Sequence, residues 1–351
     1  MNFSDLKIID LSTVLAGPSV GTFFAELGAE VIKIESPQFP DVTRSWKLPT
    51  ENPESTISAY FSSVNYRKKY LELDFSKTDQ LNELMTLLEE ADILLTNFKK
   101  SSENKFGLTS EILFEKFPKL IIGKISGFGE DSDRIAYDLI LQAETGFMSM
   151  NGTPDSGPVK MPVALIDVLA AHQLKEGILV GLIDRISSQK GRKVSVSLYD
   201  AALSSLANQA SNFLMENHIP ERIGSLHPNI APYGEIFKTK DEILVTFAIG
   251  SDQHFEKFTT LLELPELLDD LRFKTNQNRV KNRTDLAQII QNRISLVNST
   301  LLLNGCHTNF IPAARIKNLS EVFDDNEAQT LILEEEISGK PTKRVTSIAF
   351  K

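Results

Sequence analysis

The chain has few of the residues that characterise disulfide-linked or metal-binding proteins. Its 351 residues contain a single cysteine, Cys306, and five histidines. One cysteine excludes an internal disulfide and a thiolate metal cluster. The histidines show none of the spacings typical of metal ligands. We therefore expect no metal site, and cysteine usage fits a cytoplasmic protein.

Long apolar runs are also missing. No stretch reaches the ~18 consecutive apolar residues of a membrane span. The opening "MNFSDLKIIDLSTV" has neither the basic flank nor the cleavage site of a signal peptide. The net charge of −10 disfavours nucleic acid as a partner. We expect neither a membrane nor a nucleic acid as partner.

A small phosphorylated ligand remains possible, because it needs only a local basic cluster. Two such clusters are present, "NYRKKY" at residues 65–70 and "NFKKSSENK" at residues 97–105. Either could instead be a solvated surface run, and taken alone each pattern favours that simpler interpretation.

The chain up to about residue 200 alternates strand and helix patterns. Apolar strands are expected at "LKIIDL", "AEVIKIE", "DILLTNF", "KLIIGKISGFG" and "KVSVSL", with helical segments between them. This alternation predicts an α/β protein with a doubly wound, Rossmann-like parallel sheet. Such sheets bind ligands beyond the carboxyl ends of their strands.

The second part of the chain predicts a smaller unit. Three prolines and one glycine over residues 219–232 indicate a linker. We predict a large Rossmann-like domain over residues 1–217, a linker over 218–232 and a small α+β domain over 233–303. Residues 304–351 would then form a return linker and the C-terminal part of the large domain.

Familiar nucleotide-binding and nucleophile motifs are absent. The first strand–turn–helix contains Gly17 and Gly21, four apart, which is not G-x-G-x-x-G. A nicotinamide cofactor is therefore not expected. The chain has no G-x-x-x-x-G-K-[ST] phosphate loop and no G-x-S-x-G nucleophile elbow.

Asp167 allows two interpretations. It ends the apolar run 163–166 and precedes a long helical pattern, so it is expected to be the helix N-cap. The positive end of the helix dipole would hold its carboxylate ionised. If that carboxylate faces a cleft, it could act as a covalent nucleophile. The local pattern favours the plain cap.

Several segments, taken in order, resemble the family III CoA-transferases, a family that also includes α-methylacyl-CoA racemases. The most telling are "DLSTVLAGPSVGTFFAELGAEVIKIESP", "ADILLTNFKKSSENKFGLT", "VALIDVLAAH" and "GRKVSVSLYDAAL". The resemblance covers nearly the whole chain. It implies that acyl-CoA and a carboxylic acid are the substrates, with no tightly bound cofactor. It also implies a homodimer of two interlocked, ring-shaped subunits.

The resemblance also implies roles for particular residues. Asp167 matches the nucleophile, which would carry the reaction through an aspartyl anhydride and an aspartyl-CoA thioester. Contacts to CoA are implied at Val14, Leu15, Ser36, Leu73, Asp74, Phe75, Ser76, Asn97, Phe98, Lys99, Lys105, Tyr137 and Asp138. Two of these positions depart from the family, and the family's usual Pro-Gly after the Asn-Phe-basic triplet is "KS" here. Ser36 stands where some members stack an arginine on the adenine, and Lys105 stands where many have arginine.

Two alternatives to the transferase remain. A racemase needs a second acid/base group, but Tyr137 occupies the place of its histidine, and a phenol of pKa about 10 is a poor substitute. A non-catalytic acyl-CoA-binding homologue is the other, because family members continue past the strand matching "SIAFK". The presence of Asp167 argues against lost activity.

Overall fold

A computed structural model describes residues 2–350, which divide into two compact units. The larger unit comprises residues 2–150, 159–220 and 330–350, and the smaller unit comprises 151–158 and 221–329. This division differs from the expected one, in which residues 218–232 were a linker, whereas residues 221–232 here belong to the smaller unit. Residues 151–158 belong to the smaller unit, and so do residues 304–329, which we had expected to lead back to the large domain.

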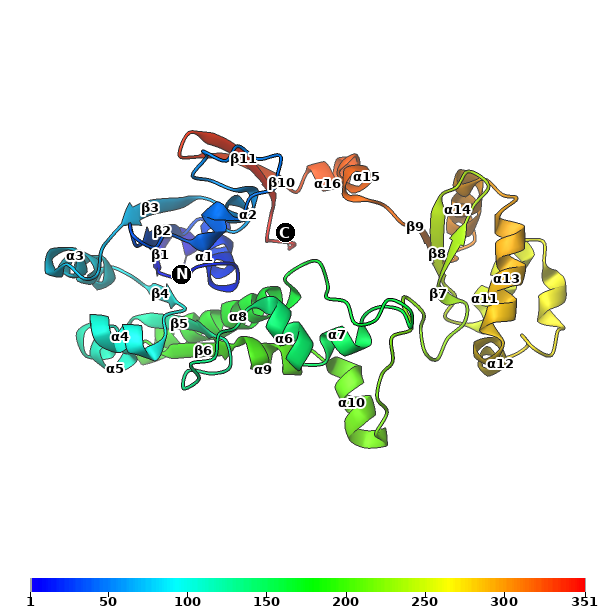
Figure 1. Ribbon diagram of the computed structural model, residues 1–351, viewed down its shortest axis with the longest axis horizontal. Helices are drawn as coiled ribbons and strands as arrows, with labels where there is room; N and C mark the ends of the chain where they lie inside the picture. Colours follow the sequence, from blue (N-terminus) through cyan, green and yellow to red (C-terminus); the bar gives the residue numbers. More distant parts are fainter. Residues whose placement is uncertain (1, 351) are drawn as a thin grey trace. The chain divides into compact units, whose positions relative to one another are not determined.

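A six-stranded sheet forms the centre of the larger unit (Figure 1). Its strands are β1 (Lys7–Asp10), β2 (Glu30–Glu35), β3 (Lys68–Glu72), β4 (Ile93–Thr96), β5 (Ile121–Ser126) and β6 (Lys193–Ser197). Their order is β3-β2-β1-β4-β5-β6, and every neighbouring pair is parallel. The order reverses between β1 and β4, as in a doubly wound Rossmann-like sheet. The predicted α/β fold is confirmed.

Helices cover both faces of this sheet, so its central strands read as nearly continuous apolar runs. Successive side chains of β1 pack on opposite faces of the sheet. Ile8 packs in a cluster with α1 (Ala16–Glu26), α8 (Leu165–Ser188) and α9 (Leu198–Ser204). Ile9 packs on the other face with α3 (Thr78–Glu89) and α5 (Ser110–Lys116). The sheet therefore has a core on each side.

The strand β3 was not expected from the sequence. We had taken residues 65–70 as a basic, surface-type cluster, and this was wrong for Lys68. Its ammonium group is buried at the start of β3 and pairs with Asp10 at the end of β1. A charged strand was missed because its charge is neutralised by a residue 58 positions away.

Shorter elements and a C-terminal hairpin complete the larger unit. They are the 3₁₀ turns η1 (Phe3–Asp5) and η2 (Val42–Ser45), the helices α2 (Ala59–Ser63), α4 (Lys100–Phe106), α6 (Asp138–Glu144), α7 (Phe147–Met150) and α10 (Ala207–Glu216), and the strands β10 (Ile332–Ile337) and β11 (Lys340–Val345). The hairpin β10–β11 lies beside α2, where Ile337 packs against Ile57 and Phe61 (Figure 1).

The smaller unit has an antiparallel sheet of three strands. These are β7 (Tyr233–Lys238), β8 (Leu244–Ala248) and β9 (Ala313–Arg315), in that order. Its helical elements are α11 (Asp252–Leu261), η3 (Pro265–Leu268), α12 (Asn276–Lys281), α13 (Arg283–Ile294), α14 (Ser299–Thr308), α15 (Leu319–Phe323) and α16 (Asn326–Gln329). In both units, across residues 2–350, no helix is both long and apolar enough to cross a membrane.

The glycines of the first helix allow α1 to approach the loop that follows β1. A Cβ on Gly17 would overlap the side chain of Ser12, and one on Gly21 would crowd the Asp10 carboxylate and Lys68. The pair therefore permits close packing over buried charges.

We predict that Gly17→Ala lowers the free energy of unfolding by about 1–3 kcal/mol, because the loop after β1 must move to admit the methyl group. Gly250→Ala is the control, since its Cβ would meet nothing within 4 Å. Calorimetric unfolding of the two variants measures the difference. Equal stability of both variants would contradict the packing argument.

Candidate active site

The reversal in strand order creates a crevice between the carboxyl ends of β1 and β4. Thr13 follows β1 and Asn97 follows β4, and the two residues join across it. The Thr13 N–H donates to Asn97 Oδ1 at 3.3 Å, and Asn97 Nδ2 donates to the Thr13 carbonyl at 3.1 Å. The predicted residue Asn97 is thus fixed at the middle of the crevice.

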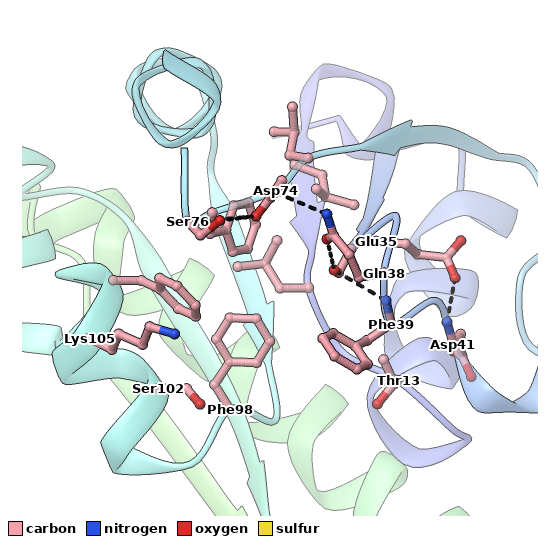
Figure 2. A pocket seen from close by; sticks show the side chains of 16 residues that line it. Thr13, Glu35, Gln38, Phe39, Asp41, Asp74, Ser76, Phe98, Ser102 and Lys105 are labelled. Atoms are coloured by element: carbon pink, nitrogen blue, oxygen red, sulfur yellow. Dashed lines mark hydrogen bonds between the residues drawn. The ribbon is translucent and has the colours of Figure 1, made fainter. Parts of the chain in front are cut away.

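A cavity of about 560 Å³ opens on the β2–β3 side of this junction, and we call it the first cavity (Figure 2). Seven of the predicted CoA contacts line it: Ser36, Leu73, Asp74, Phe75, Ser76, Phe98 and Lys105. Lys105 on α4 reaches toward it from one side, Phe39 and Gln38 lie opposite, and Phe98 is between them (Figure 2). Lys105 is the cation among its lining residues.

Polar groups at the edge of the first cavity are ordered. Asp74 accepts hydrogen bonds from Ser76 Oγ at 2.6 Å and from Gln38 Nε2 at 3.0 Å. These bonds, the one from Ser76 first, lower the pKa of Asp74 below its usual value. Phe39 exposes 83% of its surface beside the cavity, an unusual exposure for phenylalanine.

A second cavity, of about 250 Å³, opens on the β5 side of the junction. It is lined by the predicted residues Val14, Asn97, Phe98, Lys99 and Tyr137. Of the remaining predictions, Leu15 lines neither cavity but caps α1, and its carbonyl accepts from Ser19 N–H at 2.9 Å.

The backbone at Val14 is held in a conformation that valine rarely adopts. Its φ is 74°, in the left-handed region, where a β-branched side chain is strained. The Val14 N–H donates to both carboxylate oxygens of Asp41, at 3.2 and 3.3 Å. Asp41 in turn pairs with Lys33 at 3.1 Å, and Lys33 donates to the Ser12 carbonyl at 2.7 Å. The Lys33–Asp41 pair therefore fixes the backbone of the loop after β1 at both Ser12 and Val14.

A second buried pair supports the same loop. Lys68 Nζ donates to Asp10 Oδ2 and to the Pro18 carbonyl, both at 2.8 Å. Although burial opposes it, the charges of Lys68 and Lys33 lower the pKa of Asp10. Both ion pairs have no exposed side-chain surface. The sequence analysis did not identify Lys33 or Asp41.

The helix α4, which carries Lys105, is anchored by a further buried charge. Lys124 on β5 donates to Glu103 on α4 at 2.6 Å, and Lys124 is 2% exposed. The Lys124–Glu103 ion pair therefore anchors α4, which brings Lys105 of the predicted cluster at 97–105 to the first cavity.

Asp167 lies in the first turn of α8 and is 8% exposed. The expectation that it is the N-cap was wrong, because α8 begins at Leu165 and Ala164 is the N-cap. Its carboxylate makes no hydrogen bond or ion pair within the part of the chain that the structure describes. A buried carboxylate without such partners is uncommon in folded proteins.

Asp138, also 8% exposed, is the charge beside Asp167. It accepts from the Ile166 N–H at 2.8 Å and from Gln142 Nε2 at 2.7 Å, so it links the start of α6 to the start of α8. Burial, and then the Asp138 charge, raise the pKa of Asp167 to about 7. The expectation that the helix dipole keeps Asp167 ionised at neutral pH is therefore corrected.

Aromatic rings lie close to these carboxylates. Trp46 packs edge-on against Tyr60 at 5.1 Å and lies 6.5 Å from Tyr137. Burial, followed by the charges of Asp167, Asp138 and Asp41, raises the pKa of Tyr60 to about 12. Tyr60 thus stays neutral beside three carboxylates. No sequence motif had pointed to Trp46 or Tyr60.

Within residues 2–350, no group of three or more histidine, cysteine, aspartate or glutamate side chains is arranged so that it could hold a metal ion. No histidine lines either cavity; His172 lies further along α8 and is exposed. Among the lining residues that sequence reasoning missed, Gln38 and Phe39 belong to no motif, and Ser102 and Phe106 lie in the segment around the basic cluster 97–105 without having been singled out.

In doubly wound α/β proteins, ligands bind in the crevice at this reversal of strand order, so the fold defines the class and the place of the candidate site. Sequence comparison then gives the family, because the profile of CoA-transferase family III matches residues 3–350. The chain belongs to this family and is a CoA-transferase, as the resemblance in its sequence had implied.

Named relatives agree with this assignment. The chain is 36% identical to the succinate–glutarate CoA-transferase of Agrobacterium fabrum, over 93% of this chain and 82% of that protein. It is 35% identical to the succinyl-CoA:glutarate CoA-transferase of Mus musculus, over 93% and 74% of the two chains. A crystal structure of a CAIB/BAIF family protein from Brucella suis superposes with a TM-score of 0.85 at 34% identity, covering 98% of this chain and 91% of that one.

We predict that Asp138→Asn lowers the pKa of Asp167, because it removes the neighbouring negative charge while burial remains. If ionised Asp167 is needed for turnover, kcat/KM for CoA transfer falls on acidification through about pH 7 in the wild type. In the variant this fall moves to lower pH, by about one unit. Because the pKa of Asp167 is raised, the folded protein holds the Asp167 proton more tightly than the unfolded chain does. The resulting contribution to the free energy of unfolding is fully present below pH 3.8, the ordinary pKa, and is lost as pH rises through about 7.

Asp184→Asn is the matched control for this profile, because Asp184 lies near the other end of α8 and pairs with Arg192 at the surface. Its pH profile should coincide with that of the wild type. An unchanged profile in Asp138→Asn would contradict the assigned electrostatic coupling.

Proposed function

We propose that the enzyme moves CoA from an acyl-CoA thioester to a carboxylic acid, with Asp167 as the nucleophile. The observation that carries the proposal is the environment of Asp167, a buried carboxylate without a partner and with a pKa raised to about 7. A desolvated, more basic carboxylate is a stronger nucleophile than one held by a cation or hydrogen bonds. The other buried carboxylates named above either pair with a lysine, as Asp10, Asp41 and Glu103 do, or accept hydrogen bonds, as Asp138 does.

In the first half-reaction, CoA is transferred from the donor acid to the Asp167 carboxyl group. An Asp167 oxygen attacks the thioester carbonyl, the C–S bond breaks, and CoA leaves as the thiolate with a mixed anhydride on Asp167. The thiolate then attacks the Asp167 carbonyl carbon. The anhydride C–O bond breaks, the donor acid leaves as a carboxylate, and an aspartyl-CoA thioester remains.

The second half-reaction reverses these steps with the acceptor. Its carboxylate attacks the aspartyl thioester and expels the CoA thiolate, which forms a second anhydride. The thiolate attacks the acceptor carbonyl, so acceptor-CoA forms and the Asp167 carboxylate is regenerated. Asp138 positions this residue through the Ile166 N–H at the start of α8. Charge is conserved at each step, and no redox cofactor is required.

The two cavities suggest how CoA lies. We place its nucleotide in the first cavity. Some family members stack an arginine on the adenine at the position of Ser36, and here the ring of Phe39 offers an aromatic face instead. Lys105 offers a positive charge to a phosphate. The pantetheine arm would pass Asn97 and the Val14 backbone toward Asp167. CoA acts here as a substrate and not as a resident cofactor.

Short dicarboxylic acids are the substrate class we propose. Relatives that match over most of the chain are named for succinate, glutarate and mesaconate, which all carry two carboxylates. A racemase fits less well, because the phenol of Tyr137 stands where a second acid/base group is required. The single, buried Cys306 is compatible with a cytoplasmic location.

We predict that Asp167→Asn lowers turnover of succinyl-CoA with glutarate, succinate or mesaconate by roughly a thousandfold or more, because the amide cannot form the anhydride. CoA binding should change little, since Asp167 lines neither cavity. Hydroxylamine added during turnover of the wild type should give a hydroxamate at Asp167, detected by peptide mass spectrometry.

Asp184→Asn again serves as control and should retain wild-type turnover. Substantial CoA transfer by the purified Asp167→Asn protein, or a hydroxamate on another carboxylate, would sink the nucleophile assignment. Racemisation of a 2-methylacyl-CoA without CoA transfer would favour the racemase instead.

An interlocked homodimer is the assembly we propose. The larger unit is made of three chain segments, with the smaller unit inserted between them. Apolar side chains are uncovered on its helices: Val180, Ile183 and Ile186 form a stripe on α8, and Leu214 and Met215 are exposed on α10. Surfaces of this kind are typical of subunit interfaces.

If the subunits interlock, they cannot separate without partial unfolding. We predict that dilution to nanomolar concentration leaves the dimer intact, and that tagged and untagged protein mixed under native conditions do not exchange subunits within a day. Light scattering and pull-down of the untagged chain measure these outcomes. Rapid exchange, or a monomer on dilution, would show separable subunits.

A further inference from the structure

A small cavity lies within the larger unit, away from the crevice. It has a volume of about 190 Å³ and is bounded by α1, α8 and the residues around the end of β11. Its polar lining residues are Ser19, His172, Lys175, Arg344 and Ser347. Lys175 lies eight residues after Asp167 on α8, so the two are about 12 Å apart along the helix axis.

Lys175 is 7% exposed and carries a charge that the fold does not neutralise. No hydrogen bond or ion pair joins its ammonium group to any of residues 2–350; its close contact is the ring of Phe23, with Nζ 5.2 Å from the centroid. A buried lysine is normally paired, because burying an isolated charge is costly.

The nearby carboxylate, Glu26, does not neutralise Lys175 because it is already bound. Glu26 pairs with Arg344 and accepts hydrogen bonds from Thr346 Oγ1 at 2.5 Å and from Ser347 N–H at 3.0 Å. Lys175 and Arg344 line the cavity, and together with Glu26, which pairs with Arg344, they carry one excess positive charge.

One further observation suggests an anion. The Ser347 hydroxyl is buried and has no hydrogen-bond partner in the described structure. Burial lowers the pKa of Lys175, Arg344 lowers it further and Glu26 opposes the shift. Burial, and then the Lys175 charge, lower the pKa of His172 while Glu176 opposes, so the imidazole is uncharged near neutral pH.

We propose that this cavity binds a small oxyanion, a carboxylate or a phosphate, through a charge-assisted hydrogen bond from Lys175. The volume corresponds to roughly six water molecules, which suits inorganic phosphate or a short carboxylic acid and excludes CoA. The site is separate from the crevice and does not depend on the proposed reaction. One turn of α8, carrying Val168 and Ala171, connects it with the first turn that holds Asp167.

The first test compares anion-dependent stability in three proteins: wild type, Lys175→Met and Lys190→Met. Melting temperature is followed against added phosphate, acetate or succinate at constant ionic strength, with chloride as the reference anion. Lys190 is an exposed residue beyond the end of α8, so its variant loses the same charge elsewhere. Phosphate stabilises most folded proteins, so the difference between variants is the relevant quantity.

We expect a saturable rise in melting temperature in the wild type and in Lys190→Met, and an apparent affinity weaker by about tenfold or more in Lys175→Met. Lys175→Met should fold, because it removes an unpaired buried charge and keeps a similar volume. The anion that acts at the lower concentration identifies the ligand class. An identical response in all three proteins would overturn the proposal.

The second test reads out Lys175 itself, which separates this cavity from binding of an acid substrate near Asp167. Reductive methylation of the wild-type protein is followed residue by residue by mass spectrometry, with and without the effective anion. We expect Lys175 to be methylated several-fold more slowly with the anion, while Lys190 reacts at the same rate. Equal methylation of Lys175 in both conditions would also overturn the site.

Discussion

The buried ion pair between Lys33 and Asp41 is the constraint on which the crevice depends. The pair is worth little as a source of stability, because removing both charges from water costs about what their attraction returns. Its effect is geometric. Asp41 holds the Val14 N–H and Lys33 holds the Ser12 carbonyl, so the loop after β1 keeps Val14 at a φ of 74°. Loss of either partner would leave an uncompensated buried charge and release a strained loop.

The pairing of the other buried charges gives Asp167 its distinct character. Asp10 is neutralised by Lys68, Asp41 by Lys33 and Glu103 by Lys124. Asp167 has no cation, and its nearest charge is another carboxylate, Asp138. Burial opposes ionisation of both groups, but the charges of Lys68 and Lys33 lower the pKa of Asp10, whereas the charge of Asp138 adds to the rise at Asp167. The protein can hold an unpaired carboxylate here because Asp138 is itself fixed by the Ile166 N–H and Gln142.

Patterns within about 30 residues predicted the parallel sheet and its helices, since apolar strands and turn residues are local signals. The order of segments pointed to Asp167 and to seven of the residues that line the first cavity. Local patterns failed where the deciding partner is distant. β3 contains Lys68, whose acid lies 58 positions earlier, and Val14 depends on Asp41, 27 positions later. The start of α8 was misplaced because the true N-cap, Ala164, lies inside the apolar run 163–166 and has no capping side chain to signal it. The pKa of Asp167 depends on burial, which no sequence window reports.

Helix α8 joins these arguments, because it carries two buried charges without partners and they are opposite in sign. Asp167 in its first turn lies beside Asp138, and Lys175, two turns later, lies beside the occupied Glu26. The distance of about 12 Å is too long for the two to form an ion pair. Each therefore keeps its cost of burial until another molecule supplies a partner: the carbonyl carbon of a thioester for Asp167 and an oxyanion for Lys175. Both groups lie on one helix, which packs against α1, β5 and β6. A molecule bound at either residue therefore contacts the helix that positions the other.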